Sequence, residues 1–413
     1  MRTLGNRLEP RGAALLIVGL ALSVGGWVIR EPVLLWPGVF LALLPLTSLV
    51  GLRVADPRLK VQRTVSPAEA PVGSTLRVDL GLTQRRSTPW SLTVTDELPV
   101  EFGGAHSFLA ATPKTGESLH VAYDCRADRR GRYLVDHVTY RYADPLGLAV
   151  RAARTRTRTE IVVTPRVVPL SDVHPAASSA SGETPIPHLA FSGPDDVLVR
   201  EYQPRDDVRR VHWPSTARTG TLMVRREEQA WDPVAWVLLD DRASTCGADA
   251  AGELRFEWLV TLAASVGVTL LDGGYEVGLL SPDGRAYVAQ TRAHGSPAQG
   301  WLRNLVDAAR TTDRAVTAAL RTIDQGPSGH LVVAILGRLT LDDARELSQL
   351  RDGQHRCWAL YVPVDSTEGA AHDEQTVARD VLLDHDWEVA ALPTGFDPEP
   401  AWGGLGSSRG WAQ

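Results

Sequence analysis

Two long apolar runs open the chain. Residues 13–29 and 33–52 contain no charged side chain, and each run is long enough to cross the hydrocarbon core of a bilayer as a helix. Only the stretch from Arg30 to Pro32 separates them. So short a connection predicts a helical hairpin, because a single span would leave the second run in water.

Basic residues flank the two runs unevenly. Arg2, Arg7 and Arg11 precede the first run, Arg53, Arg58, Lys60 and Arg63 follow the second, and the turn between them holds Arg30 alone. The positive-inside rule therefore places both ends of the hairpin in the cytoplasm. A cleaved signal peptide is the competing interpretation, but residues 25–29 offer no small-x-small cleavage site and a second apolar run follows.

A period of two replaces the apolar runs between Leu59 and about Pro165. Leu76, Val78, Leu80 and Leu82 alternate with polar or small residues, as in a half-buried strand. Comparable runs occupy residues 91–96, 119–124, 133–142 and 160–164, with turn-rich breaks at 71–73, 103–104 and 129–131. Several short strands at this spacing predict an antiparallel domain resembling a β-sandwich.

The stretch from Arg151 to Arg158 looks like a nucleic-acid-binding patch at first sight. Its arginines at 154, 156 and 158 alternate with threonines, and no aromatic side chain is interleaved. This alternation is typical of the solvent face of an edge strand. Residues 165–187, rich in Ser, Ala and Pro, predict a linker or a long loop.

Strand and helix patterns alternate in the last part of the chain. Strands are predicted at 234–239, 276–280, 330–336, 358–362 and 388–392, and helices at 253–271, 299–309, 340–351 and 373–384. The first of these helices has an inward face of Phe256, Leu259, Val260, Ala263, Val266 and Leu270. Such alternation predicts an α/β domain with a doubly wound parallel sheet.

Composition and charge narrow the functional classes. The 413 residues are enough for two or three domains, and a net charge of −6 argues against a general nucleic-acid binder. The only lysines are Lys60 and Lys114, and neither follows the glycine pattern of a phosphate-binding loop. Three widely spaced cysteines, Cys125, Cys246 and Cys357, fit neither a disulfide framework nor a metal site, and reduced thiols are consistent with a cytosolic location.

Acidic residues follow the first predicted strand of the α/β domain. Ligands of doubly wound sheets bind at the carboxyl ends of strands, and oxygens of Asp240, Asp241 and Ser244 could hold a hard cation there. A sheet that opens with an Asp-x-Ser-x-Ser turn resembles the von Willebrand factor A fold, whose metal site uses that motif. This sequence departs from the motif because Arg242 stands at the middle serine position counted from Asp240. We therefore expect Arg242 to form an internal ion pair in place of a metal.

An arginine-rich motif lies between the two predicted soluble domains. Pro204 to Asp207 predicts a turn, and Asp206 is placed to cap a short helix and to pair with Arg209 and Arg210. The residues of interest are Arg200, Glu201, Tyr202, Pro204, Asp206, Asp207, Arg209, Arg210, His212, Trp213 and Arg218. They form either an internal joint between domains or a partner-binding surface.

These motifs resemble one bacterial family. Asp144-Pro-Leu-Gly-Leu148, Arg200-Glu-Tyr-x-Pro204, Asp206-Asp207-x-Arg-Arg210, His212-Trp213 and Ala217-Arg218 together resemble the family catalogued as domain of unknown function number 58, over residues 55–395. Arg205 and Pro214 depart from the family pattern. The resemblance implies a membrane hairpin, a β domain and a von Willebrand A-like domain. It also implies an accessory or adaptor role beside a MoxR-type AAA+ ATPase and a transglutaminase-like membrane protein.

The predicted organisation has five parts. Residues 1–53 form the transmembrane hairpin, 54–170 the β-sandwich-like domain, 171–232 the linker with the arginine-rich motif, 233–395 the von Willebrand A-like domain, and 396–413 a flexible tail. The favoured function is a membrane-tethered, non-enzymatic adaptor that needs no cofactor and binds no nucleic acid.

Two other functions remain open on the sequence. The first is a hydrolase that uses His212 with Asp206 or Asp207, although neither a G-x-S-x-G nor an H-E-x-x-H frame supplies supporting machinery. The second is divalent-cation-dependent binding through Asp240 and Ser244.

Overall fold

The computed structural model describes the chain in two compact units. The described residues are 2–55, 59–84, 90–110, 114, 117–173, 199–201, 213–225, 234–288, 296–312, 315–324, 330–350, 355–364 and 369–405. Unit 1 comprises residues 1–168, 248–265 and 291–311, and unit 2 comprises 169–247, 266–290 and 312–413. Unit 1 thus takes in two segments that the sequence analysis assigned to the α/β domain. The predicted five-part division stays a prediction.

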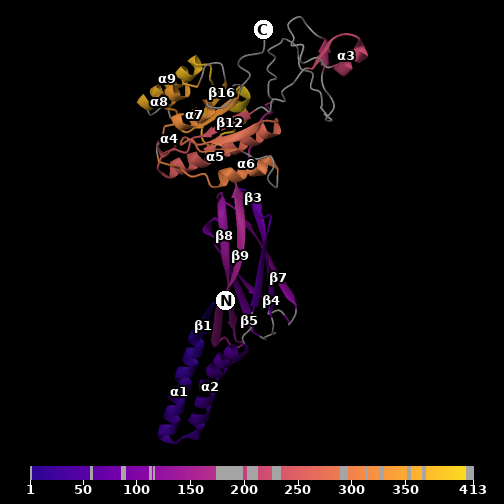
Figure 1. Ribbon diagram of the computed structural model, residues 1–413. Coiled ribbons are helices and arrows are strands. Elements are labelled where there is room, and N and C mark those ends of the chain that lie inside the picture. The colour runs from indigo at the N-terminus through magenta and orange to yellow at the C-terminus, as the bar shows by residue number, and fades with distance from the viewer. Residues whose placement is uncertain are drawn as a thin grey trace. The chain divides into compact units, whose positions relative to one another are not determined.

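The N-terminal apolar runs form two helices that lie side by side (Figure 1). Helix α1 (Pro10–Ile29) and helix α2 (Pro32–Ala55) are each slightly longer than predicted. The mean hydropathies of their most apolar stretches are 2.2 and 2.1, and both helices are long and apolar enough to cross a membrane. Glycines allow the close packing, since a Cβ atom on Gly19 would lie 2.5 Å from the backbone nitrogen of Ala42. These helices fit a membrane-associated protein.

A third helix passes the same test of length and composition. Helix α5 (Ala250–Asp272) has a mean hydropathy of 1.5 over its most apolar stretch, but 61% of that stretch is buried inside the protein, against 17% in each helix of the hairpin. Each residue of its predicted inward face is buried. The apolarity of α5 is therefore that of a core helix.

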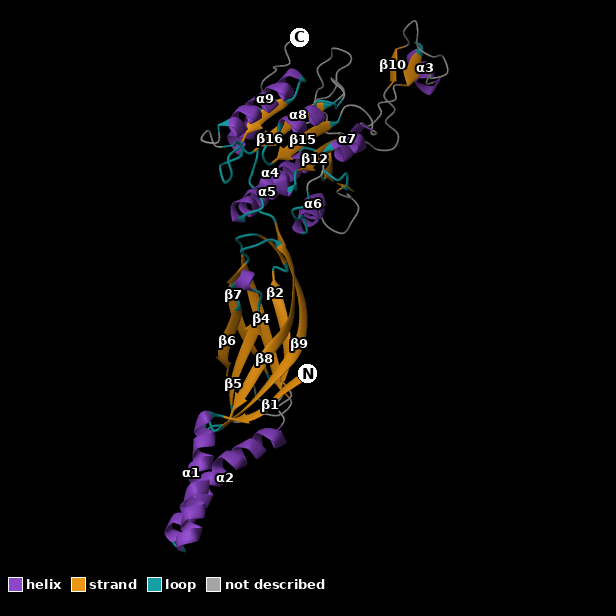
Figure 2. Cartoon of the chain, turned by 90° about the vertical axis from the view of Figure 1, so that its left-hand side faces the viewer, coloured by secondary structure: helices purple, strands orange, loops and turns teal. Residues whose placement is uncertain are grey.

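Two sheets make up the β-structure of unit 1 (Figure 2). The larger has the order β1-β9-β8-β5-β6 with β3 also beside β9, and the smaller has the order β2-β4-β7. The strands of the larger sheet are β1 (Arg2–Leu8), β3 (Glu69–Pro71), β5 (Ser91–Glu97), β6 (Ala105–Ala110), β8 (Gly131–Ala143) and β9 (Ala149–Thr164). Those of the smaller are β2 (Leu59–Ser66), β4 (Thr75–Gln84) and β7 (Ser118–Arg126). All pairs are antiparallel except β3 with β9.

Both sheets contribute to one hydrophobic core. The alternating residues predicted on β4, from Leu76 to Leu82, are fully buried and cluster with residues of the larger sheet such as Val94 and Ile161. The end of α2 joins the same core through Leu52, which is also fully buried. The predicted strands at 91–96, 119–124 and 133–142 are confirmed, and residues 160–164 are the end of the much longer β9.

The edge-strand prediction for Arg151 to Arg158 is confirmed only in part. These residues belong to β9, which pairs with β8 on one side; on the other side β1 pairs with residues 149–154 and β3 with residues 162–164, so among the described pairings residues 155–158 have β8 as their one neighbour. Strand β1 comes from the basic residues before α1, which the sequence analysis treated only as flanking charge. The solvent-facing character is confirmed for Arg156 and Arg158, which are exposed.

Unit 2 contains a largely parallel sheet. Its strands run in the order β14-β13-β12-β15-β16-β17. They are β12 (Val234–Leu239), β13 (Glu276–Leu280), β14 (Ala286–Val288), β15 (Leu331–Leu336), β16 (Arg356–Tyr361) and β17 (Glu388–Ala391). Neighbours are parallel except β14, which pairs antiparallel with β13 and was not predicted. The five predicted strands are confirmed.

Helices and a small ribbon complete the described chain. The helices of unit 2 are α3 (Trp213–Thr219), α4 (Ala243–Cys246), α7 (Thr317–Asp324), α8 (Leu341–Leu347), α9 (Ala370–Asp384) and α10 (Glu399–Gly404), while α6 (Pro297–Val306) belongs to unit 1. Strands β10 (Val199–Glu201) and β11 (Met223–Arg225) pair antiparallel. Thr340 caps α8 as its sequence suggests, accepting a hydrogen bond from the backbone nitrogen of Asp343.

Candidate functional site

The strand order of unit 2 reverses between β12 and β15, where sheets of this kind bind ligands. Strand β12 ends at Leu239 and leads into Asp240, and β15 ends at Leu336 and leads into Gly337. Asp240 is fully buried, and its Oδ2 accepts a hydrogen bond from the Gly337 backbone nitrogen at 3.3 Å. The carboxyl ends of the two central strands are therefore linked through one carboxylate.

Arg242 occupies this place with its guanidinium group. Its Nε and Nη2 donate to the two carboxylate oxygens of Asp240 at 2.8 and 3.1 Å, and its Nη1 donates to Asp343 Oδ1 at 2.6 Å. Asp343 is held in turn by Thr340, whose hydroxyl donates to its Oδ2 at 2.7 Å. The ion pair predicted for Arg242 is confirmed, and it is a two-pronged contact of the kind that fixes orientation.

The electrostatics keep this arginine charged. Burial by itself would lower the pKa of Arg242, but the hydrogen bonds and charge of Asp240, and then those of Asp343, raise the pKa above its ordinary value. One guanidinium group that carries its charge at every physiological pH is thus shared between the two buried carboxylates.

The surroundings of the candidate cation ligands Asp240, Asp241 and Ser244 differ from those of a metal site. Both side-chain oxygens of Asp240 accept hydrogen bonds from Arg242, Asp241 is half-buried, and Ser244 is exposed. Across the described ranges, no group of three or more His, Cys, Asp or Glu side chains is placed to hold a metal ion.

Most of the arginine-rich motif cannot be placed. Tyr202, Pro204, Asp206, Asp207, Arg209, Arg210 and His212 lie outside the described residues. Arg200 and Glu201 belong to β10, where they pair with Val224 and Met223 of β11. Trp213 begins α3 and is 65% exposed, and Arg218 lies in the last turn of that helix. The internal joint and the partner surface both stay predictions.

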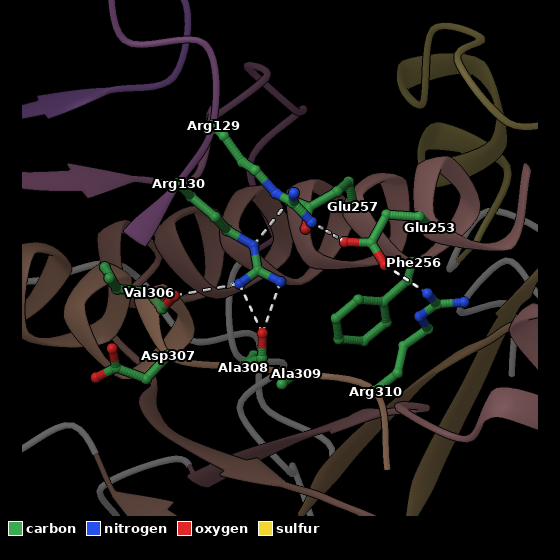
Figure 3. A pocket seen from close by; sticks show the side chains of 10 residues that line it. All are labelled: Arg129, Arg130, Glu253, Phe256, Glu257, Val306, Asp307, Ala308, Ala309 and Arg310. Carbon is green, nitrogen blue, oxygen red and sulfur yellow. Dashed lines mark hydrogen bonds and ion pairs between the residues drawn. The ribbon is translucent and has the colours of Figure 1, made fainter. Parts of the chain in front are cut away.

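A charged cavity in unit 1 was not foreseen from the sequence (Figure 3). It has a volume of about 390 Å³ and is lined by Arg129, Arg130, Glu253, Phe256, Glu257, Val306, Asp307, Ala308, Ala309 and Arg310. These residues come from the turn before β8, from the first turns of α5 and from the end of α6, all of which belong to unit 1.

Arg130 organises the cavity by capping a helix. Its Nη1 donates to the carbonyl oxygens of Leu305, Val306 and Ala308 at 3.1, 3.2 and 2.8 Å, and its Nε donates to Glu257 Oε2 at 2.9 Å. The guanidinium carbon lies 5.4 Å from the centre of the Phe256 ring. The carbonyls at the end of a helix lack intrahelical partners and carry partial negative charge, so a buried arginine satisfies them well.

The other charges of the cavity are also paired. Arg129 bonds to Glu253, whose second oxygen lies 2.6 Å from Arg310 Nη2, and Arg132 Nε donates to Asp307 Oδ2 at 2.8 Å. The arrangement therefore works as a brace that ties α5 and α6 to the β-structure of unit 1, and the signal for it in the sequence was only a pair of arginines in a turn.

Comparison with known proteins finds one family model that matches part of the chain. Residues 198–369 match the family described as "Protein of unknown function DUF58". The match supports assignment to the DUF58 family for this part of the chain. The predicted resemblance is thereby confirmed, over a shorter range than the sequence analysis assigned to it.

A relative and two solved structures were also found. "Uncharacterized protein YeaD" of Bacillus subtilis (strain 168) is 26% identical over 254 residues, which cover 59% of this chain and 61% of that protein. The CARDB domain of the PF1109 protein from Pyrococcus furiosus gives a TM-score of 0.19 at 11% identity, covering 27% of this chain and 96% of that one. The Pseudomonas fluorescens alkylpurine DNA glycosylase AlkC gives 0.15 at 15% identity, covering 36% and 45%. Scores this low do not define a shared fold.

Proposed function

We propose that this DUF58-family protein is a membrane-tethered, non-enzymatic adaptor whose α/β unit presents a protein-interaction surface in the cytoplasm. The hairpin of α1 and α2 supplies the tether, and the basic residues on both of its outer flanks favour cytoplasmic ends. Most of the two helices' large apolar side chains are exposed, as expected for surfaces that face lipid.

The observation that carries the adaptor role is the arginine at the strand-order reversal of unit 2. Where related architectures hold a ligand, Arg242 bridges Asp240 and Asp343, so an internal cation takes the place between the two carboxylates. A site filled in this way supports a surface that binds a partner without a cation, in preference to a catalytic or cation-gated site.

The finer architecture is part of the proposal. The parallel strands of unit 2 with one antiparallel edge strand, and the acidic turn after β12, support a von Willebrand A-like domain with its metal replaced. The single core shared by the two sheets of unit 1 supports a β-sandwich-like spacer.

The proposed partner is a MoxR-type AAA+ ATPase, with a transglutaminase-like membrane protein in the same assembly. The carboxyl edge of the unit 2 sheet is the proposed contact surface, because ligand-binding turns of doubly wound sheets gather there. The turn from Asp240 to Gly247 lies at this edge, and Ser244 within it is exposed.

The test is photo-cross-linking in native membranes from two exposed positions of unit 2. A cross-linking amino acid at Ser244 samples the carboxyl edge of the sheet, and one at Glu276, the first residue of β13, samples the amino edge. We expect the Ser244 probe to capture an AAA+ ATPase and the Glu276 probe to capture much less of it. Absence of the ATPase from the Ser244 products, or equal capture at both positions, would contradict the proposal.

A further inference from the structure

The turn from Asp144 to Leu148 is one of the motifs that carry the family resemblance, yet the proposed adaptor function does not involve it. It connects β8 to β9 at the end of unit 1 from which the hairpin leaves. The backbone nitrogen of Gly147 donates to the carbonyl of Asp144 at 2.9 Å, and Gly147 has a φ of 65° that favours glycine. Pro145 and Leu146 form the exposed tip of this turn.

Asp144 makes the turn rigid and fastens it to the hairpin. Its buried carboxylate accepts hydrogen bonds from the backbone nitrogens of Leu146, Leu148 and Ala149 at 3.2, 2.7 and 2.8 Å. It also accepts one from the hydroxyl of Ser48, on α2, at 3.0 Å. One carboxylate thus joins the turn to the second helix of the hairpin.

The first helix holds the other side of the same turn. The carbonyl of Leu148 accepts a hydrogen bond from the Glu9 backbone nitrogen at 2.9 Å, directly before α1 begins. Gly12 packs so closely that a Cβ atom there would lie 2.1 Å from the Leu148 carbonyl oxygen. The turn is therefore clamped between the start of α1 and the last turns of α2.

The length of the helices sets the level of this clamp in the membrane. Helical rise puts Ser48 roughly 24 Å from the start of α2 at Pro32. The hydrocarbon core is about 30 Å thick, so Ser48 and the bonded turn lie near its cytoplasmic boundary. Three exposed arginines lie near these ends of the helices in the sequence: Arg7 just before α1, Arg11 at its start and Arg53 near the end of α2. Anionic lipid headgroups would meet them at this level.

Leu146 projects from this rigid turn with 59% of its surface exposed. On α2, the helix whose Ser48 bonds to Asp144, Leu43, Leu46 and Val50 are likewise between 42% and 56% exposed. We propose that the Asp144–Leu148 turn is a second membrane contact, which places Leu146 in the lipid interface and holds the β-structure of unit 1 against the bilayer. This inference rests on the proposed membrane tether.

The proposal is tested with nitroxide spin labels on the full chain in vesicles of phosphatidylcholine and phosphatidylglycerol. Cysteine is introduced singly at Leu146, at Leu43 and at Val100, and collisions with oxygen and with a water-soluble nickel chelate are measured. Leu43 faces outward from α2, whereas Val100 is 87% exposed in a 3₁₀ turn (Val100–Phe102) packed beside Tyr133 near the opposite end of β8. The three native cysteines are buried, so the parent chain measures background labelling.

The expected result is a severalfold lower nickel collision rate at position 146 than at position 100, with oxygen collisions at least as frequent as those at position 100. A label at 146 that meets nickel as often as the one at 100 would overturn the membrane contact and leave the tether intact. Shielding from both oxygen and nickel would mean coverage by protein, and it would also overturn the inference. An aqueous signal at 43 would sink the inference and the proposed tether together.

Discussion

Buried arginines neutralise carboxylates inside both units. In unit 1 the fully buried Arg63 donates through Nε to Asp96 Oδ2 at 3.1 Å, and through Nη1 to the carbonyl oxygens of Val135 and Thr157, each at 2.9 Å. Tyr123 donates its hydroxyl to the same Asp96 at 2.7 Å. Burial first, and then the bond to Asp96, raises the pKa of Tyr123. Such a network is costly to desolvate and is strongly destabilising when half of it is removed.

The Arg63→Ala substitution should therefore lower the free energy of unfolding by about 3–5 kcal/mol, because it leaves Asp96 charged and buried. The matched control is Arg126→Ala, since Arg126 pairs with Asp128 while both side chains are about 70% exposed. We expect the control to change stability by less than about 1 kcal/mol. Urea unfolding of the full chain in detergent measures both, and similar losses in the two variants would contradict a structural role for the buried pair.

His330 gives unit 2 a dependence on pH. It is buried, and Trp236 Nε1 donates to its Nδ1 at 3.2 Å, which requires a free lone pair on that nitrogen. Burial first, and then the nearby ring of His355, lowers the pKa of His330. The folded state thus binds fewer protons than the unfolded state, whose histidine pKa is about 6.5. Stability is present above this value and is lost as the pH falls towards the lowered pKa.

Unit 2 should consequently unfold at a lower temperature at pH 5 than at pH 7, and His330→Asn should remove part of that difference. The control is His385→Asn, because His385 is an exposed histidine of the same unit. Thermal unfolding followed by tryptophan fluorescence at both pH values gives the comparison. If His330→Asn kept the full difference while His385→Asn reduced it, the assignment to His330 would fail.

At the scale of elements, Arg130 is expected to control the end of α6. Replacing it with alanine removes its bonds to the carbonyls of Leu305, Val306 and Ala308, which then lack a buried donor. The amides of α6 should exchange with solvent at least about tenfold faster, which corresponds to 1.4 kcal/mol of local opening. Hydrogen exchange with mass spectrometry on the full chain in detergent makes this measurement.

Arg132→Ala is the matched control for this prediction. Arg132 reaches Asp307 from the same part of unit 1, but its side chain is 42% exposed and it bonds to no carbonyl of α6 in the contacts above. We expect little change in the exchange of α6 from this substitution. Equal acceleration in the two variants would show that the cap at the helix end is unimportant.

Elements with a regular apolar period could be predicted from the sequence, and others could not for identifiable reasons. Strand β4 buries every second residue and was predicted. Strand β2 also alternates, but its buried face includes the charged Arg63, which hides the period. Strand β6 alternates between exposed and more buried positions, but its apolar Leu109 faces outward and its His106 does not, which hides the period in the sequence. The groups that Arg130 caps at the end of α6 are backbone carbonyls, which no residue type marks.

At the scale of the whole molecule, the order of the parts along the chain could be predicted from the sequence, but which segments belong to each compact unit could not. The hairpin, the β-strands and the parallel sheet follow one another as expected, and Arg242 forms the ion pair expected of it. The inclusion of residues 248–265 and 291–311 in unit 1 depends on contacts with distant residues such as Arg130 and Glu69. Long-range pairs of this kind leave no local period, and the arginine-rich motif stays a prediction because most of it lies outside the described residues.

The central claim is that two apolar helices form a transmembrane hairpin and hold the remaining chain in the cytoplasm. The most direct test is a pair of carboxyl-terminal fusions to the full chain, one to a fluorescent protein that folds only in the cytoplasm and one to a phosphatase that is active only outside it. The account predicts a fluorescent first fusion and an inactive second fusion, with both proteins in the membrane fraction. An active phosphatase with a dark fluorescent fusion would contradict it.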